Sequence, residues 1–504
     1  MNPNSKLAHA PQIDLQAAKV QRHKILVIGT GFSGLCMGVK LREMGETDFV
    51  LLERADDVGG TWRDNTYPGC ACDVPSHLYS FSFEPNPNWS RMYAPQPEIY
   101  AYLKGVATKY DLLKHIRFNA NLKCARYDDA RKLWVAEAGD GRVFEADILV
   151  SGMGGLSNPA TPHIKGLDQF KGATFHSATW DHDYNLVGKR VAVIGSGASA
   201  IQFVPKIAPQ VDQLHYFQRT PPWVVPKDDR ALTQREKADF SANPWRQQWQ
   251  RTKLYWTLEI RFLAFKFKPE WMGLVAKVAK HKIRQAIKDP VLQAKLTPDY
   301  TPGCKRLLIS NDYYPALART NVEVITEGIR EVTPRGVVTD DGVERPVDAI
   351  ILGTGFKVQN PIPPNTLFGK GGIDLANVWK NGPEAYLGVA VSGFPNFFML
   401  MGPNTGLGHN SMVFMIESQA HYIVNAIKAM KEQRIQALNV KPEAQNQFID
   451  QVQGQLQKTV WNSGCKSWYV DDKGRNSLLW PGFTFAYRLK TRHFNLSKYT
   501  TDKA

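Results

Sequence analysis

Two glycine-rich stretches in this chain of 504 residues have the spacing that binds the pyrophosphate of a dinucleotide. Glycines spaced in this way let the backbone turn tightly and approach an anion, while the N-terminus of the following helix faces the negative charge. A turn that only lets a helix pack against a strand would have the same pattern. The residues concerned are Gly29, Gly31 and Gly34 in the first stretch, and Gly195 and Gly197 in the second, where Ala200 replaces the third glycine.

The residues around the first stretch predict the elements that would position it. An apolar run at residues 25–28 is typical of a buried parallel strand, and residues 35–45 have helical spacing. A second apolar run follows and ends at Glu53. An acid at the end of this second strand accepts hydrogen bonds from a ribose diol. The first unit is therefore predicted to bind a dinucleotide.

The second unit repeats the pattern but ends its second strand with Arg219 and Thr220 instead of an acid. A carboxylate there would repel a 2′-phosphate, whereas an arginine pairs with one. We therefore predict that this unit prefers NADPH to NADH, with Ser199 also among its cofactor-binding residues. A surface arginine at a strand end is the alternative.

Other segments indicate how the chain is divided. The glycine pair Gly59–Gly60 after Glu53 resembles FAD-binding units of the glutathione-reductase type. Residues 348–356 resemble the strand that returns the chain to the FAD domain, and residues 393–406 resemble the segment that covers the flavin ring. The predicted fold is α/β, with two Rossmann-like domains and a helical insertion. The expected parts are a flexible tail (1–22), the FAD domain (23–155 and 346–504, the latter including the C-terminal segment) and the inserted NADPH domain (156–345, with the helical insertion at about 228–300).

The cysteines do not match a redox or metal motif. Cys70 and Cys72 are two positions apart, too close for an easy bridge in extended chain, so a disulfide reductase is disfavoured. An oxidase, a flavin or quinone reductase and a monooxygenase remain as alternatives. We expect free thiols in a reducing cytoplasm and no metal site. The six cysteines are Cys36, Cys70, Cys72, Cys124, Cys304 and Cys465.

The stretch "FKGATFHSATWD" fits the pattern Phe-x-Gly-x3-His-x3-Trp-Asp/Pro. It resembles the fingerprint of Baeyer–Villiger monooxygenases, flavoenzymes that insert oxygen beside a ketone carbonyl. The stretch from Gly59 to Asp73 independently fits a second pattern of that family, and the resemblance covers nearly the whole chain. Flavin monooxygenases that oxidise nitrogen and sulfur usually lack the Trp-Asp ending. The fingerprint residues are Phe170, Gly172, His176, Trp180 and Asp181.

On spacing alone, His176 would be a linker histidine and Trp180 a packing residue. The family resemblance instead places both in the connection between the FAD and NADPH domains, with an indirect role in coupling cofactor position to turnover.

The resemblance also implies a mechanism and roles for individual residues. NADPH reduces the FAD, O2 adds to give a C4a-peroxyflavin, and this attacks a ketone to yield an ester or lactone, with sulfides as side substrates. Arg306 would hold the peroxy anion and Asp73 would position the arginine. Lys305 would reach the 2′-phosphate, and Trp468 the nicotinamide ribose. Further FAD-binding residues would be Gly60, Thr61 and Trp62, together with Asp73.

Without the resemblance, Lys305 and Arg306 are a basic surface pair and Asp73 is a turn residue. Leu307 stands where the family usually has proline, which is a departure in this loop. Three rival functions are an N- or S-oxygenating flavin monooxygenase, an NADPH oxidase, and a flavoprotein that senses NADPH without turning over a substrate.

The net charge is +15, but no nucleic-acid-binding motif is present, and two phosphorylated cofactors account for a need for basic residues. Residues 231–290 contain 13 Lys and Arg against 5 Asp and Glu, together with several tryptophans. These helices either line a substrate channel or lie on a membrane surface. The chain has no apolar run long enough to span a membrane and no secretory signal at its N-terminus. We expect a cytoplasmic enzyme with a small ketone as its partner; the oligomeric state is not predicted.

Overall fold

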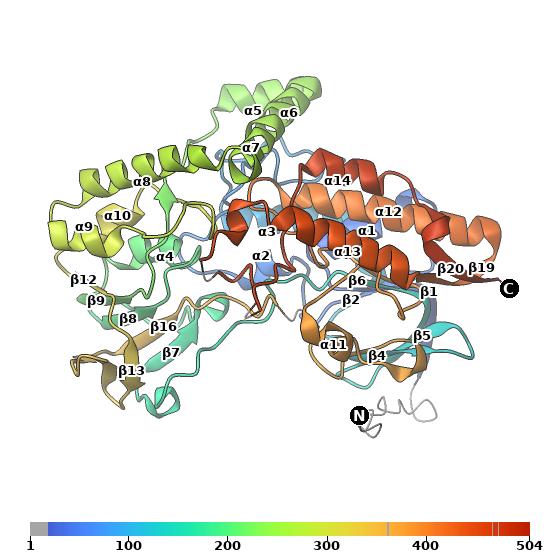
Figure 1. The fold of residues 1–504 in the computed structure, drawn as a ribbon, viewed down its shortest axis with the longest axis horizontal. Helices are drawn as coiled ribbons and strands as arrows, with labels where there is room; N and C mark the ends of the chain where they lie inside the picture. Colours follow the sequence, from blue (N-terminus) through green and yellow to red (C-terminus); the bar gives the residue numbers. More distant parts are fainter. Residues whose placement is uncertain (1–18, 360–361, 466, 472, 504) are drawn as a thin grey trace.

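The computed structural model describes residues 19–359, 362–465, 467–471 and 473–503 (Figure 1). Two largely parallel sheets form its framework. The first has eight strands in the order β17-β4-β5-β6-β1-β2-β3, with β18 also paired to β6. These strands are β1 (Val20–Ile28), β2 (Phe49–Leu52), β3 (Ile116–Arg117), β4 (Leu122–Asp128), β5 (Leu133–Ala138), β6 (Val143–Ser151), β17 (Leu367–Phe368) and β18 (Phe397–Met399).

The second sheet has five parallel strands in the order β12-β9-β8-β16-β7. They are β7 (Ala173–His176), β8 (Arg190–Ile194), β9 (Gln213–Phe217), β12 (Val322–Ile325) and β16 (Ala349–Leu352). Smaller sheets are formed by β10 (Val224–Val225) with β11 (Leu308–Ile309), by β13 (Ile329–Val332), β14 (Gly336–Thr339) and β15 (Glu344–Pro346), and by β19 (Ile435–Val440) with β20 (Tyr499–Lys503).

Helices cover both sheets and form a layer between and above them (Figure 1). One face of the first sheet packs against α1, α3 and the long α12, and the other face packs against a segment that includes Leu375 and Trp379, because the apolar side chains of β1 and β2 need cover on both faces. The helices are α1 (Phe32–Glu43), α2 (Thr61–Asp64), α3 (Gln96–Lys109), α4 (Ala200–Ile207), α5 (Gln234–Ala242), α6 (Pro244–Ile260), α7 (Phe262–Lys266), α8 (Met272–Ala286), α9 (Pro290–Leu296), α10 (Tyr313–Leu317), α11 (Leu375–Val378), α12 (Met412–Gln433), α13 (Pro442–Leu456) and α14 (Thr484–Thr491).

The two strand–glycine–helix units predicted from the sequence are present. β1 lies between β2 and β6 in parallel register, and α1 follows it directly. β8 lies between β9 and β16, and α4 follows it. The predicted helical insertion is formed by α5 to α9, from Gln234 to Leu296.

The chain returns to the first sheet later than the sequence indicated. We expected residues 348–356 to form a strand of the FAD domain, and this is wrong. β16 pairs with β7 and β8, so it completes the second sheet, and the return strands are β17 and β18. A short buried run such as Ala349–Leu352 has the same apolar pattern in either sheet, so periodicity does not tell which sheet it joins.

The expected tail is also shorter than predicted at its C-terminal end. Val20, Gln21 and Arg22 belong to β1, where they pair with residues 143–145 of β6. The part of the expected tail at residues 1–18 lies outside the described residues. The first sheet nevertheless contains strands that precede the second sheet in the sequence and strands that follow it, as an inserted domain requires.

Candidate functional site

The first glycine turn has a backbone that only glycine allows. Gly29 has φ of +92°, and a Cβ there would lie 2.8 Å from the carbonyl oxygen of Gly152. A Cβ at Gly34 would collide with the carbonyl oxygen of Gly29. Gly31 caps α1 without a side-chain hydrogen bond, and no acid lies in the first turn of that helix. The N-terminal amides of α1 are thus open to an anion.

The second glycine pair packs directly on this turn. The amide of Gly59 donates to the carbonyl of Thr30 at 3.0 Å, and a Cβ at Gly60 would lie 3.1 Å from the Cα of Gly31. Gly60 is the N-cap of α2, which starts at Thr61. The ring of Trp62, by contrast, is buried in the main core. The structure therefore places Gly59 and Gly60 beside the first glycine turn, whereas the Trp62 ring lies in the core.

Glu53 lies one residue beyond the end of β2, as predicted. Its side chain is buried and its Oε2 accepts hydrogen bonds from the backbone amide of Thr30 at 3.1 Å and its hydroxyl at 2.6 Å. Its Oε1 accepts from the amide of Ala55 and from Arg63. The carboxylate is thereby fixed beside the first glycine turn.

The second glycine turn is built in the same way. Gly195 has φ of +113°, and a Cβ there would collide with the carbonyl of Gly353. No heavy atom comes within 4 Å of a Cβ placed at Gly197, so the turn is open on that side. Ser199 is the N-cap of α4. Thr220 accepts a hydrogen bond at its carbonyl from Ser196, which holds the end of the second strand against the turn.

Arg219 and Lys305 place two positive charges at this turn. Arg219 is exposed, and the ammonium of Lys305 lies 4.6 Å from the centre of the Tyr300 ring. Burial, and then the charge of Arg219, lower the pKa of Lys305. The two cations repel each other, so an anion placed between them would be attracted to both; their contact with a 2′-phosphate stays a prediction.

Arg306 and Asp73 form an ion pair between the two halves of the site. Nη2 and Nε of Arg306 donate to Oδ2 of Asp73 at 2.5 and 3.1 Å, and both side chains are 32% exposed. The charge of the Asp73 carboxylate raises the pKa of Arg306 and outweighs the opposite effect of the guanidinium's partial loss of solvent. Burial alone would raise the pKa of Asp73, but the guanidinium outweighs it and lowers that pKa. Both groups therefore stay charged at neutral pH.

The loop that carries Asp73 is attached to the second unit by a residue that the sequence analysis missed. Gln202 on α4 accepts a hydrogen bond from the Tyr67 hydroxyl at 2.9 Å and donates to the carbonyl of Ala71 at 2.9 Å. A Cβ at Gly69 would lie 2.7 Å from the Gln202 carbonyl, so this position requires glycine. The tyrosine and glycine of the second family pattern thus dock the loop on α4, whereas a glutamine on a helix has no recognisable signal in the sequence.

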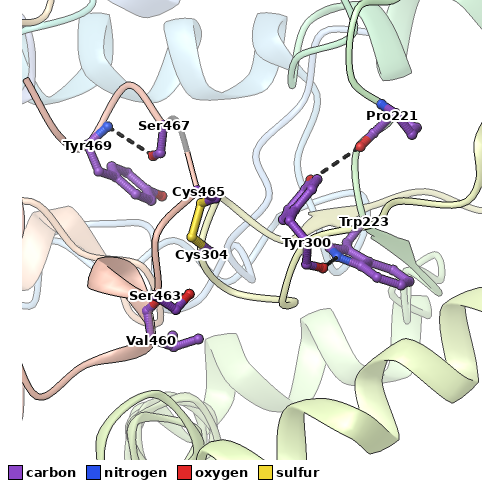
Figure 2. The surroundings of a disulfide bond; sticks show 9 residues. All are labelled: Pro221, Trp223, Tyr300, Cys304, Val460, Ser463, Cys465, Ser467 and Tyr469. Atoms are coloured by element: carbon purple, nitrogen blue, oxygen red, sulfur yellow. Dashed lines mark hydrogen bonds between the residues drawn. A yellow bond between two sulfur atoms is a disulfide. The ribbon is translucent and has the colours of Figure 1, made fainter. Parts of the chain in front are cut away.

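The loop that leads to Arg306 is held at two points, Tyr300 and Cys304 (Figure 2). The carbonyl of Tyr300 accepts from the Trp223 indole at 2.8 Å, and its hydroxyl donates to the carbonyl of Pro221 at 3.3 Å. Cys304 forms a disulfide with Cys465, with the two Cα atoms 6.3 Å apart. The expectation of six free thiols is therefore wrong for this pair, because the fold brings together two cysteines 161 positions apart. The other four cysteines are free and buried.

Tyr469 is a second residue that the sequence analysis missed. It is 1% exposed, and its hydroxyl has no hydrogen-bond partner among the described residues. Burial raises the pKa of Tyr469, and the neighbouring charge of Arg306 opposes this shift. Trp468, which was predicted, is instead 48% exposed and packs against the Tyr469 ring at 4.4 Å. A buried hydroxyl without a partner beside Arg306 is suited to contact a bound group.

The stretch from Phe170 to Asp181 forms β7 and the turn after it, and so belongs to the second sheet. A Cβ at Gly172 would collide with the carbonyl of Asp348, which keeps β7 close to β16. His176 is buried; its Nδ1 accepts from the amide of Ala178, and burial lowers its pKa. Trp180 packs on Phe203 of α4 at 5.3 Å.

The end of this stretch forms a local turn. Asp181 accepts from the amides of Asp183 and Tyr184. His176 therefore belongs to the edge strand β7, and Trp180 packs on helix α4. The contacts described for these two residues do not involve Arg306 or Asp73.

Other kinds of site are not found in the described part of the chain. Among these residues no group of three or more His, Cys, Asp or Glu side chains is arranged to hold a metal ion. None of the described helices is long and apolar enough to cross a membrane.

Comparison with known proteins agrees with this site. The family described as flavin-binding monooxygenase-like matches residues 22–239. A Baeyer–Villiger monooxygenase of Pseudomonas aeruginosa is 53% identical over 99% of this chain and 94% of its own length. The closed crystal structure of cyclohexanone monooxygenase superposes with a TM-score of 0.87 at 29% identity, over 96% of this chain and 100% of that one. The crystal structure of OTEMO in complex with FAD and NADP has a TM-score of 0.86 at 29% identity, over 95% and 99% of the two chains.

Proposed function

The chain belongs to the Baeyer–Villiger monooxygenase family, and from this premise we propose that it uses FAD, NADPH and O2 to convert ketones to esters or lactones. The ion pair between Arg306 and Asp73 carries this proposal. A permanently charged guanidinium, held in a fixed direction by the Asp73 carboxylate, is suited to stabilise negative charge that develops on oxygen.

The first glycine turn fits an FAD pyrophosphate. Gly29 and Gly34 let the backbone of the turn pack closely, a Cβ at Gly31 would meet no atom nearer than 3.7 Å, and the helix N-terminus has no side-chain cap. Glu53 would accept the ribose hydroxyls, and the backbone at Gly60 and Thr61 adjoins the same turn. FAD, when bound, supplies the activation of O2, which no side chain of the protein provides.

The second turn fits NADPH. Gly195, Gly197 and Ser199 would contact the pyrophosphate, while Arg219, Thr220 and Lys305 would contact the 2′-phosphate. Trp468 would lie on the outer side of the nicotinamide half, since its ring is half exposed. The related OTEMO structure contains both FAD and NADP, which supports the assignment of two dinucleotides.

Arg306 and Asp73 would act on the reacting oxygen atoms. Arg306 keeps its proton across the working pH range, so its role is to bind and orient negative charge, and Asp73 positions the guanidinium. The Tyr469 hydroxyl would donate a hydrogen bond into the same space. We assign no proton transfer to His176, because its ring lies against the second sheet.

Product analysis tests the proposal. The purified protein, with NADPH and O2, is given cyclic, aryl and long-chain ketones, and the products are identified by mass spectrometry. Esters or lactones, formed with matching consumption of NADPH and O2, are expected. A thioether assay tests the proposed side activity on sulfides. Oxidation of amines or thioethers without any ester would favour the N- or S-oxygenating alternative, and hydrogen peroxide as the sole product would favour an NADPH oxidase.

Flavin reduction without any substrate-dependent consumption of oxygen would identify an NADPH sensor. We propose the cytoplasm as the place of action, since NADPH is regenerated there.

A further inference from the structure

Helix α6 buries two charged side chains on its inner face, beside apolar residues such as Leu258. Arg251 is buried, and its Nη1 donates to the carbonyls of His77 at 2.7 Å and Ser80 at 3.0 Å. Glu259 has no exposed surface and accepts from the side chains of Asn410 at 2.5 Å and Thr484 at 2.8 Å. The charged side chains on the inner face of α6 thus have hydrogen-bond partners within the protein, and this fixes which face of the helix points outward.

The opposite face of α6 carries a stripe of large apolar side chains. Trp245, Trp249, Trp256 and Ile260 are 65%, 67%, 47% and 56% exposed. Successive members are four, seven and four residues apart, and this spacing places all of them on one side of a helix. A stripe of three exposed tryptophans is unusual, because such side chains are normally buried in part against other residues.

The stripe continues onto α14 and the end of α7. The rings of Trp256 and Phe485 are 5.9 Å apart, and Phe485 and Phe267 both stack on Phe483. Leu489 lies one helical turn beyond Phe485 and is 61% exposed. Figure 1 shows α6, α7 and α14 along the upper edge of the molecule. We call this surface the aromatic face; it consists of Trp245, Trp249, Trp256, Ile260, Phe267, Phe485 and Leu489.

Positive charges accompany the aromatic face. From Trp245 to Phe267 the chain has five Lys and Arg, of which Arg251 is buried on the inner face, and a single acid, the buried Glu259. Helix α14 contributes Arg488 and Lys490 and has no acid. Tryptophan belongs at the boundary between lipid headgroups and acyl chains, and each Lys or Arg nearby is attracted to anionic headgroups.

We propose that the aromatic face binds the surface of an anionic lipid bilayer. The tryptophans would enter the headgroup region, and the cations beside them, such as Lys253 and Arg261, would contact acidic lipids. A second copy of the chain fits less well, since a two-fold contact would place the same cations opposite one another. Lining of a substrate channel by these tryptophans is disfavoured, because their side chains point outward from the inner face.

Vesicle flotation tests this proposal with the full-length protein. We would use vesicles of phosphatidylcholine alone and with 30% phosphatidylglycerol, at low and high salt. The wild type is expected to float with the anionic vesicles and to dissociate in high salt. The triple variant Trp245→Ser/Trp249→Ser/Trp256→Ser should bind at least ~10-fold more weakly, because each indole that it removes can bury 150–250 Å². An equal thermal midpoint and bound flavin content would confirm that the variant is folded.

A matched control removes exposed apolar side chains elsewhere. Leu113, Val187 and Val343 are 44%, 61% and 46% exposed and lie outside the aromatic face, so Leu113→Ser/Val187→Ser/Val343→Ser should bind vesicles like the wild type. The proposal is overturned if the wild type does not bind anionic vesicles, or if both triple variants bind equally well. A concentration-dependent dimer that the tryptophan variant abolishes, without vesicle binding by the wild type, would identify a second copy as the occupant.

Discussion

Asp73 and Arg306 form a two-bonded ion pair although 233 positions separate them in the chain. Asp73 follows the loop docked on α4, and Arg306 lies in the loop tied to Trp223 and Cys465. The guanidinium therefore takes its direction from two segments that are each fixed by their own contacts. The pair joins a loop of the first unit to a loop of the second, and the first two predictions below depend on it.

Removal of the Arg306 charge should abolish oxygenation. We expect Arg306→Ala to lower the rate of ester formation by at least ~10²-fold, because one fixed donor to a developing oxyanion contributes on this scale. NADPH should still be oxidised, with hydrogen peroxide as the product. Arg306→Lys should restore little of the ester formation, since an ammonium on a flexible stem does not reproduce the planar fork that contacts Asp73. Ester yield and peroxide, measured together, decide the outcome, and full ester yield from Arg306→Ala would contradict the assignment.

Removal of Asp73 should give a milder form of the same defect. In Asp73→Ala the arginine keeps its charge but loses both of its hydrogen bonds to the carboxylate. We expect the ratio of ester to peroxide to fall between those of the wild type and Arg306→Ala. Asp183→Ala, at an exposed aspartate, serves as the control. A defect in Asp73→Ala larger than in Arg306→Ala would assign the carboxylate a role of its own.

Arg219 should determine the preference for NADPH. A charged hydrogen bond contributes about 1.5–3 kcal/mol, so Arg219→Ala should reduce the preference for NADPH over NADH roughly 10- to 150-fold. The Michaelis constants for both cofactors measure this effect. Arg335→Ala removes a surface arginine paired with Glu344 and should change neither constant. Equal weakening of NADPH and NADH in Arg219→Ala would show that Arg219 does not contact the phosphate.

The pH dependence of stability should have a contribution from His77. Burial, and then the charge of Arg251, lower the pKa of His77 to about 4, whereas an unfolded histidine has a pKa of about 6.5. Between these values the unfolded chain binds more protons, so stability falls as the pH is lowered from about 6.5 toward 4. The thermal midpoint of His77→Gln should therefore fall less between pH 7.5 and pH 5 than that of the wild type. His281→Gln, at an exposed position, should follow the wild type, and identical curves for all three proteins would refute this role.

Thiol labelling should distinguish a disulfide between Cys304 and Cys465 from a protein in which all six cysteines are free thiols. After denaturation without reductant, four cysteines should react with N-ethylmaleimide: Cys36, Cys70, Cys72 and Cys124. Reduction before labelling should add Cys304 and Cys465. Mass spectrometry of the labelled peptides provides the count. Labelling of all the cysteines without reductant would restore the expectation of free thiols.

Local signals in the sequence were sufficient for the glycine turns. Gly29 and Gly195 need positive φ and a close approach to a neighbouring carbonyl, and only glycine satisfies both. The cofactor contacts predicted for Glu53 and Arg219 rest on the place of each residue at the end of a strand. The Arg306–Asp73 pair was predicted only through resemblance to a family, since composition alone indicated a surface pair.

The remaining features depend on the folded chain. The disulfide joins segments 161 positions apart, and no local pattern marks either cysteine. β16 pairs with β7 and β8, and Asp348 just before it accepts a hydrogen bond from the amide of Arg190 at the start of β8; these contacts are non-local and leave no pattern in the sequence. The outward direction of the α6 tryptophans depends on which face of the helix finds polar partners, and those partners lie at His77 and Thr484, far away in sequence.

The disulfide between Cys304 and Cys465 also changes the topology of the chain. It closes a covalent ring that contains β16 of the second sheet together with β17, β18 and α12, which pack in the first unit. The two units are thus linked by a closed loop as well as by the chain segments outside it. A protease that cuts once inside the ring would leave the two fragments joined, and they would separate on a denaturing gel only after reduction.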